Sequence, residues 1–162
     1  MGEIIKVGMA DLKVCRYPDS LTTIGLGSCV GIALYDSVTK ITGLAHIMLP
    51  DSTAIKNNSN IAKFADTGIE ETLRIMESMG ASRMRIVAKI AGGANMFQFA
   101  IDNNSTLKVG ENNVAAVKKK LQELKIPIIS EDTGLNYGRT VIIHSDDGAY
   151  EIRAVGKPAK II

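Results

Sequence analysis

The sequence predicts a mixed α/β (α+β) fold of β-sheets with two principal helices, in one domain that covers residues 1–162. Three observations predict it: several short β-branched and apolar runs, two longer segments with apolar residues at helical spacing, and turn-forming residues between them. A chain of 162 residues is long enough to bury one core. We therefore expect helices that cover faces of the sheets.

The expected strands begin within residues 4–14, in one or two pieces around Gly8. Residues 30–36 and 41–49 form the next pair, joined by the four-residue connection 37–40. Residues 30–36 are apolar on both alternations, which is typical of a central strand covered on both faces. Four later strands are expected, the last two as a hairpin around an Asp-Asp-Gly turn: 84–91, 126–130, 140–144 and 150–155.

Two segments have the periodicity of amphipathic helices. In the first, apolar residues recur at helical spacing from Ile61 to Met79, and Gly80 occupies the position where a helix often ends. The second runs from Glu111 to Leu124, and its cluster of three lysines, 118–120, is interpreted as a solvated face. The polar stretch 50–60 before the first helix is expected to be a loop.

Composition excludes several classes of protein. The net charge of +2 is too small to indicate attraction to DNA or a membrane, and aromatic residues make up only 4% of the chain, with no tryptophan to stack on bases. No secretory leader and no apolar run of about 20 residues is present, so we expect a cytoplasmic protein without membrane insertion. Two cysteines do not make a disulfide framework, and in the cytoplasm both are expected to stay reduced.

The most informative segment places Cys29 directly after a glycine-containing run, with His46 in the next expected strand. If Asp36 faces Ile41 across the turn, Gly31 lies opposite His46, and Cys29 becomes a diagonal neighbour of His46 on the same face of the sheet. The absence of a side chain on Gly31 is expected to leave room for the His46 ring to tilt toward the sulfur. A slip of one residue would send the two side chains to opposite faces. A thiol and an imidazole are the minimum set for covalent acyl transfer, so this register predicts an active site.

The glycines before the cysteine suggest a second catalytic element. Gly25 and Gly27 permit positive φ and close approach of another chain segment. A loop of this kind can direct several N–H groups toward one point, so the backbone around Gly27, Ser28 and Cys29 is a candidate for stabilising an oxyanion.

Other interpretations of these residues stay open on the sequence. Free cysteines are often inert core residues, which is the interpretation for Cys15, and His46 alone would fit a buried core histidine. His144 precedes a turn and is expected to be exposed and structural. A zinc site from both cysteines and both histidines has suitable ligand types but lacks the short paired spacings. Gly92-Gly93 has no Lys-Ser/Thr pair after it, so a tight turn beside a neighbouring segment explains it better than a phosphate loop.

Five segments together resemble the CheD family of chemoreceptor glutamine deamidases: TIGLGSCVG (23–31), GLAHIMLP (43–50), KIAGGANMF (89–97), GENNV (110–114) and EDTGLNYGR (131–139). The resemblance covers nearly the whole chain. It departs from the family at Ala91, where a bulky residue is common. The family fold that it implies is a three-layer α/β sandwich.

The resemblance also implies the chemistry and the partners. It makes Cys29 the nucleophile, His46 the base and Thr23 the third catalytic residue, which orients the ring. The implied enzyme is a protein-glutamine glutaminase, an amidohydrolase without a cofactor or metal, whose substrates are glutamine side chains of methyl-accepting chemotaxis receptors. The implied partner is a CheC-type phosphatase, with the chain a monomer or a heterodimer with CheC.

We further expect a nearby imidazolium to lower the pKa of Cys29. A protein substrate predicts an open groove, for which Met96, Phe97 and Phe99 are candidates, although a core role fits them equally. A non-catalytic adaptor that binds CheC or receptors is the main alternative. A redox-sensing thiol is disfavoured because no resolving cysteine is evident.

Overall fold

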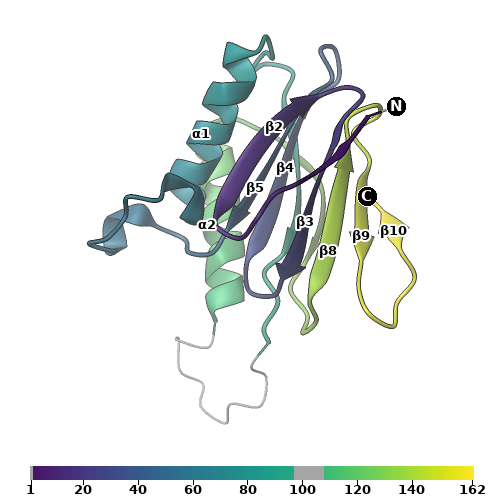
Figure 1. Ribbon diagram of the computed structural model, residues 1–162. Helices are drawn as coiled ribbons and strands as arrows, with labels where there is room; N and C mark the ends of the chain where they lie inside the picture. The colour runs from purple at the N-terminus through teal and green to yellow at the C-terminus, as the bar shows by residue number, and fades with distance from the viewer. Residues whose placement is uncertain (1, 97–107) are drawn as a thin grey trace.

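The computed structural model describes residues 2–96 and 108–162, which form two mixed five-stranded sheets and two α-helices in three layers (Figure 1). The central sheet has the order β2-β5-β4-β6-β7, with the bounds Asp11–Arg16, Ile41–Ile47, Val30–Asp36, Val87–Gly92 and Ile128–Thr133. The outer sheet has the order β1-β3-β8-β9-β10, with the bounds Ile4–Lys6, Ser20–Leu26, Arg139–His144, Tyr150–Arg153 and Lys160–Ile161. The expected α+β sandwich with mixed sheets is confirmed.

Both helices, α1 (Ala65–Ser78) and α2 (Val109–Glu123), lie on one face of the central sheet, and the outer sheet covers the other face (Figure 1). Two short 3-10 helices, η1 (Ser52–Ala54) and η2 (Ile61–Lys63), precede α1. Gly80 has φ +116° and follows the last helical turn, as its position in the sequence predicts. Among the described residues, no helix combines the length and the apolar character needed to cross a membrane.

The central sheet separates two apolar cores. On β4, Val30, Ile32 and Leu34 pack toward the helices, whereas Ala33 and the preceding Cys29 pack toward the outer sheet. The strand is buried along its whole length. This confirms the expectation of a central strand covered on both faces.

The predicted register of the β4–β5 hairpin is confirmed, with Asp36 opposite Ile41 and Gly31 opposite His46. Strand β5 ends at Ile47, two residues earlier than expected. The reason is that the N–H groups of Met48 and Leu49 turn away from β4 and donate to the carbonyl of Lys63.

Several other boundaries differ from the prediction: α1 begins only at Ala65, β7 covers Ile128–Thr133 and not 126–130, and β9 ends at Arg153, two residues early. Strand β6 begins at Val87 because residues 82–86 form a turn in which the N–H groups of Arg85 and Ile86 donate to the Ser82 carbonyl. Met84, expected in the strand, is 93% exposed.

Strands β3 and β10 were not among the expected strands. Strand β3 contains Gly25 with φ +82°, and its register with β8 is interrupted between Thr23 and Leu26.

Candidate active site

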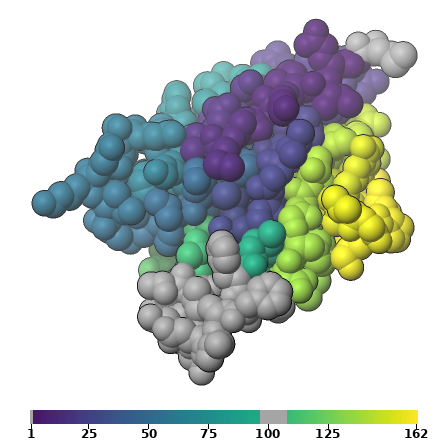
Figure 2. Space-filling view, turned by 60° about the horizontal axis from the view of Figure 1, so that its bottom comes forward, coloured from purple at the N-terminus to yellow at the C-terminus, as the bar shows by residue number. Residues whose placement is uncertain are grey.

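Cys29 lies in the tight loop 27–29 that connects β3 of the outer sheet to β4 of the central sheet. Figure 2 is turned toward this end of the molecule, where segments of both sheets meet. Each carbonyl of the loop has a donor: Gly27 accepts from the Ala94 N–H at 2.8 Å, Ser28 from Asn113 Nδ2 at 2.9 Å, and Cys29 from the Gly93 N–H at 2.8 Å. The loop is therefore held from its carbonyl side.

The amide side of the loop is different. The Gly27 N–H donates to the Gly25 carbonyl at 3.1 Å, so this N–H, which we named as part of the oxyanion loop, already has an acceptor. Within residues 2–96 and 108–162, the N–H groups of Ser28 and Cys29 have no acceptor in another residue. These two amides are the donors that the loop leaves available.

Gly92 shows why the double glycine follows β6. It has φ +109°, and a Cβ at this position would lie 2.3 Å from the Cys29 carbonyl oxygen. No other residue type allows this approach. The interpretation of Gly92-Gly93 as a turn that brings two backbone segments together is confirmed.

His46 is completely buried between the two sheets, and its ring is held by the outer sheet. Its Nδ1 lies 2.7 Å from Thr23 Oγ1 on β3, and Thr23 Oγ1 donates to the Val7 carbonyl at 2.8 Å. A hydroxyl has one proton, and a carbonyl can only accept, so Thr23 accepts from His46 and the ring carries its proton on Nδ1. The opposite nitrogen, Nε2, keeps its lone pair and has no hydrogen-bond partner among the described residues.

Gly31 does not have the role that we expected of it. The space over this glycine was expected to let the imidazole tilt toward the sulfur. Instead, a Cβ on Gly31 would lie 2.8 Å from the Tyr150 hydroxyl and 3.0 Å from Leu26 Cδ1, so these groups fill that space. The Tyr150 hydroxyl donates to the Gly31 carbonyl at 2.9 Å. Gly31 therefore lets the two sheets pack closely behind the site.

Burial determines the charge state of the site. It raises the pKa of the Cys29 thiol, and the residue's own backbone N–H offsets part of this effect. Burial also lowers the pKa of His46. Both directions favour the neutral thiol and the neutral imidazole at rest. The expected lowering of the thiol pKa by an imidazolium is therefore wrong for the resting site, and His46 can serve as a base only when the thiol reacts.

Access to Cys29 is narrow, because its exposed fraction is 7%. Met96 is 42% exposed, and its Cγ would lie 3.3 Å from a Cβ on Gly27, so it borders the loop at the surface and does not belong to the core. Phe97 and Phe99, the other candidates for a groove, lie outside the described residues.

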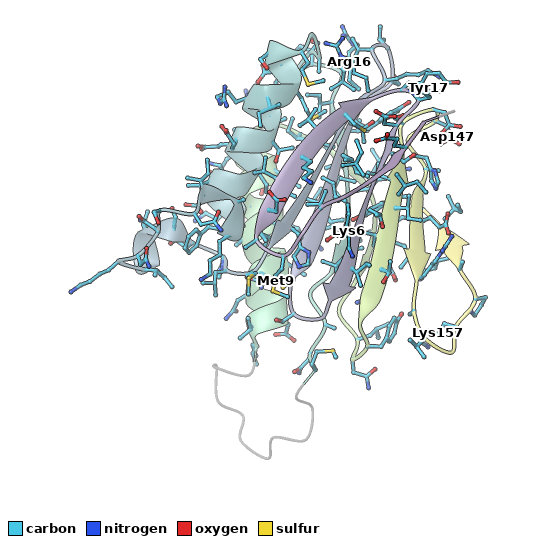
Figure 3. All side chains as sticks on the ribbon, in the orientation of Figure 1. Lys6, Met9, Arg16, Tyr17, Asp147 and Lys157 are labelled. Atoms are coloured by element: carbon cyan, nitrogen blue, oxygen red, sulfur yellow. The ribbon has the colours of Figure 1, made fainter. Side chains whose placement is uncertain are left out.

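The other cysteine and histidine lie elsewhere. Cys15 on β2 pairs with Thr42, four residues along β5 from His46. It precedes Arg16, which Figure 3 labels at the end of β2 opposite to Met9. His144 Nε2 lies 3.2 Å from Glu151 Oε1. Among the described side chains, no three His, Cys, Asp or Glu residues gather as a metal site.

Two supports of the site were missed by the sequence reasoning. Asn113 of α2 is completely buried and contacts the cysteine loop.

The second support is an ion pair of buried residues, in which Arg139 Nε lies 3.0 Å from Asp132 Oδ2. Arg139 Nη1 also donates to the Gly134 carbonyl at 3.0 Å, and the Gly134 N–H donates to the Gly92 carbonyl at 3.0 Å. The ion pair thus fixes the position of Gly92 and Gly93, and the Gly93 N–H binds the Cys29 carbonyl.

A thiol, an imidazole and a hydroxyl that holds one ring nitrogen are the types of side chain that cysteine hydrolases use. The family model for CheD chemotactic sensory transduction matches residues 48–154. Relatives extend the similarity to the segments that contain Cys29 and His46. The chain belongs to the CheD family.

Three relatives illustrate the similarity. A protein of Lachnoclostridium phytofermentans named "Probable chemoreceptor glutamine deamidase CheD" is 61% identical over 162 residues, which cover 100% of both chains. A protein of Caldanaerobacter subterraneus with the same name is 52% identical and covers 99% of this chain and 98% of its own. The "Chemoreceptor glutamine deamidase CheD" of Halalkalibacterium halodurans is 50% identical, with 100% of both chains covered.

Among solved structures, the Bacillus licheniformis hypothetical protein YfiH aligns with a TM-score of 0.46 and 16% identity, covering 83% of this chain and 60% of that one.

Proposed function

We propose that this chain is a cysteine-dependent deamidase that converts glutamine side chains of chemotaxis receptors to glutamate. The observation that carries the proposal is the hydrogen-bonded series Val7–Thr23–His46, which leaves Nε2 unprotonated on the face of the sheet that also bears Cys29. The names of the relatives supply the substrate class. Cys29 Sγ is not hydrogen-bonded to Nε2 among the described residues, so the proposal requires the two groups to approach when the substrate binds. A neutral imidazole and a neutral thiol suit an amide substrate, because the same ring can first accept a proton and then donate it.

In the first half of the reaction, the Cys29 sulfur attacks the carbon of the substrate carboxamide while the thiol proton moves to His46 Nε2. The carbonyl oxygen becomes an oxyanion, for which the N–H groups of Ser28 and Cys29 are the donors. His46 then gives the proton to the substrate nitrogen, the C–N bond breaks, and ammonia leaves. The product of this half is a thioester on Cys29.

In the second half, water attacks the thioester carbon and gives a proton to His46 Nε2. The C–S bond then breaks, the sulfur leaves as a thiolate, and His46 returns the proton to it. The product side chain is a glutamate. Thr23 contributes by holding Nδ1, which keeps the ring in the tautomer that both halves require.

The direct test uses a receptor cytoplasmic fragment and mass spectrometry. We expect the wild-type protein to raise the mass of specific glutamine-containing peptides by about one dalton each and to release ammonia in the same amount. Cys29→Ala is the control and should produce neither. Equal conversion by the variant would contradict the assignment of the nucleophile.

We also propose that the chain binds a CheC-type phosphatase, the partner that the resemblance to the CheD family implies. Titration of the chain with such a phosphatase, followed by light scattering of the mixture, should give a heterodimer of one copy of each. If the wild-type protein binds but never deamidates the receptor fragment, a non-catalytic adaptor is the better description. If the titration gives no complex, the partnership is wrong.

A further inference from the structure

Asn113 is a buried side chain of α2 that joins the two segments bearing the proposed catalytic groups. Its Nδ2 donates to the Ser28 carbonyl and to the Met48 carbonyl, each at 2.9 Å. Ser28 immediately precedes Cys29, and Met48 follows His46 by two residues. The side-chain amide has two hydrogens, so both are used in this bridge.

The bridge lies where the pairing of β4 with β5 stops. The last pair in register is Val30 with Ile47, and the next would be Cys29 with Met48. At that point β5 departs, because the Met48 N–H donates to the Lys63 carbonyl. Asn113 therefore replaces the missing strand pairing with a contact from a third element.

The bridge also determines where one N–H group points. In a trans peptide group, the C=O and the N–H point in opposite directions. Asn113 holds the C=O of the peptide group between Ser28 and Cys29, so the Cys29 N–H points away from α2. The same N–H lowers the pKa of its own sulfur, so it lies close to the atom that would attack the substrate carbon.

Helix α2 is packed directly against the segment that binds the cysteine loop, so Asn113 has a fixed position relative to that loop. A Cβ on Gly110, in the first turn of α2, would lie 2.4 Å from the Ala94 carbonyl oxygen. The backbones of α2 and of residues 93–94 are therefore in direct contact. Because residues 93 and 94 also bind the carbonyls of Cys29 and Gly27, α2 and the cysteine loop form one connected unit.

We propose that Asn113 is a positioning residue for deamidation: through the Ser28 carbonyl it aims the Cys29 N–H at the oxyanion, and through the Met48 carbonyl it holds the end of the strand that carries His46. This inference rests on the proposed function. It predicts that loss of the bridge harms the step that forms an oxyanion more than it harms the reactivity of the thiol.

The test compares Asn113→Ala with Asn112→Ala, a matched control at an exposed asparagine one position earlier on the same helix. With a receptor fragment as substrate, we expect Asn113→Ala to lower kcat by about 100-fold, the typical cost of one oxyanion donor, and to change KM by no more than about twofold. Alkylation of Cys29 by iodoacetamide forms no oxyanion, so its plateau rate at alkaline pH, where the thiol is ionised in both proteins, should stay within about twofold of wild type. The control should match wild type in both assays.

Two results would overturn the inference: a kcat for Asn113→Ala equal to that of the control, or an alkylation rate that falls as far as kcat does, which indicates general loss of structure. Amide NMR spectra give a readout that needs no substrate. The Cys29 amide resonance should move in Asn113→Ala and stay in place in Asn112→Ala, and an unmoved resonance in both contradicts the inference. If the wild-type protein does not deamidate, the proposed function fails, and the NMR comparison alone decides the role of Asn113.

Discussion

The two cysteines of the chain lie between the same two sheets, toward opposite ends of the inter-sheet layer. Both are buried and unpaired, with exposed fractions of 5% for Cys15 and 7% for Cys29. Burial raises the pKa of both thiols, for Cys15 to about 11 with a further contribution from the charge of Asp19. Because the pKa of each thiol is raised, neither is activated by ionisation at rest.

The difference between them is in their neighbours. The Cys15 sulfur donates to the Asp19 carbonyl at 3.5 Å, inside regular strand structure. Cys29 lies at the end of a strand, beside two N–H groups without an acceptor in another described residue, and on the sheet face of an imidazole with a free nitrogen. The comparison teaches that a reactive thiol here would depend on groups that act during the reaction and not on a thiolate present beforehand.

The largest expected effect comes from matched serine substitutions. Cys29→Ser keeps the size of the side chain but replaces the sulfur with a much weaker nucleophile, so the rate of ammonia release should fall by about 10⁴-fold or more. Cys15→Ser should keep turnover within about twofold of wild type. Comparable losses in the two variants would remove the distinction between the thiols.

His46→Ala should follow, with a loss of about 10²–10⁴-fold in turnover, because general acid–base help is removed from both halves of the reaction. Single-turnover measurements with the receptor fragment would separate formation of the thioester from its hydrolysis. A variant that forms the thioester at the wild-type rate would show that His46 is not the base for Cys29.

Thr23→Val should have a smaller effect, because it removes only the group that holds the ring. Losing one buried hydrogen bond of about 1–3 kcal/mol corresponds to roughly 10–100-fold in rate. Thr23→Ser retains the hydroxyl and should recover most of the activity. If the serine variant is as slow as the valine variant, the methyl packing of Thr23 matters more than its contact with His46.

The smallest expected effect is a shift in the pH at which kcat/KM and stability fall to half of their change. Because burial lowers the pKa of His46, kcat/KM should fall only as the pH drops below about 6.5, when the ring gains a proton and loses its lone pair. The same protonation favours the unfolded chain, so stability that is present above this pH is lost as the pH falls through the lowered pKa.

The pH dependence of alkylation by iodoacetamide tests the neutral resting state at the two thiols. The rate at Cys29 should rise with a midpoint above the ordinary thiol value of about 8.5, and Cys15 should need still more alkaline conditions, near its pKa of about 11. Fast alkylation of Cys29 at acidic pH would indicate a thiolate–imidazolium pair and contradict the neutral resting state.

The parts of the site that follow from local pattern could be predicted. A four-residue connection between two apolar strands defined the register that places Gly31 opposite His46, and with it the shared face of Cys29 and His46. Both helices were evident from the spacing of their apolar residues. The assignment of Thr23 came from the resemblance alone, because β3 and β5 belong to different sheets and no periodicity connects them.

The remaining parts depend on contacts between distant segments. Asn113 is 85 residues from Ser28 and 65 residues from Met48 along the chain, and an asparagine in a helix pattern gives no sign of such contacts. Arg139 is an arginine with an exposed fraction of 2%, against the usual preference of this residue for the surface. Its burial depends on Asp132 and on the carbonyl of Gly134, which only the folded structure brings together.

The hydrogen bond between Thr23 and His46 crosses from one sheet to the other. Enzymatic turnover would consequently act as a reporter of how the two layers associate during folding. In a refolding experiment, circular dichroism would register each sheet as it forms, whereas catalysis would return only with the tight closure of one layer on the other. A compact but loosely packed intermediate would thus be rich in strands and catalytically silent.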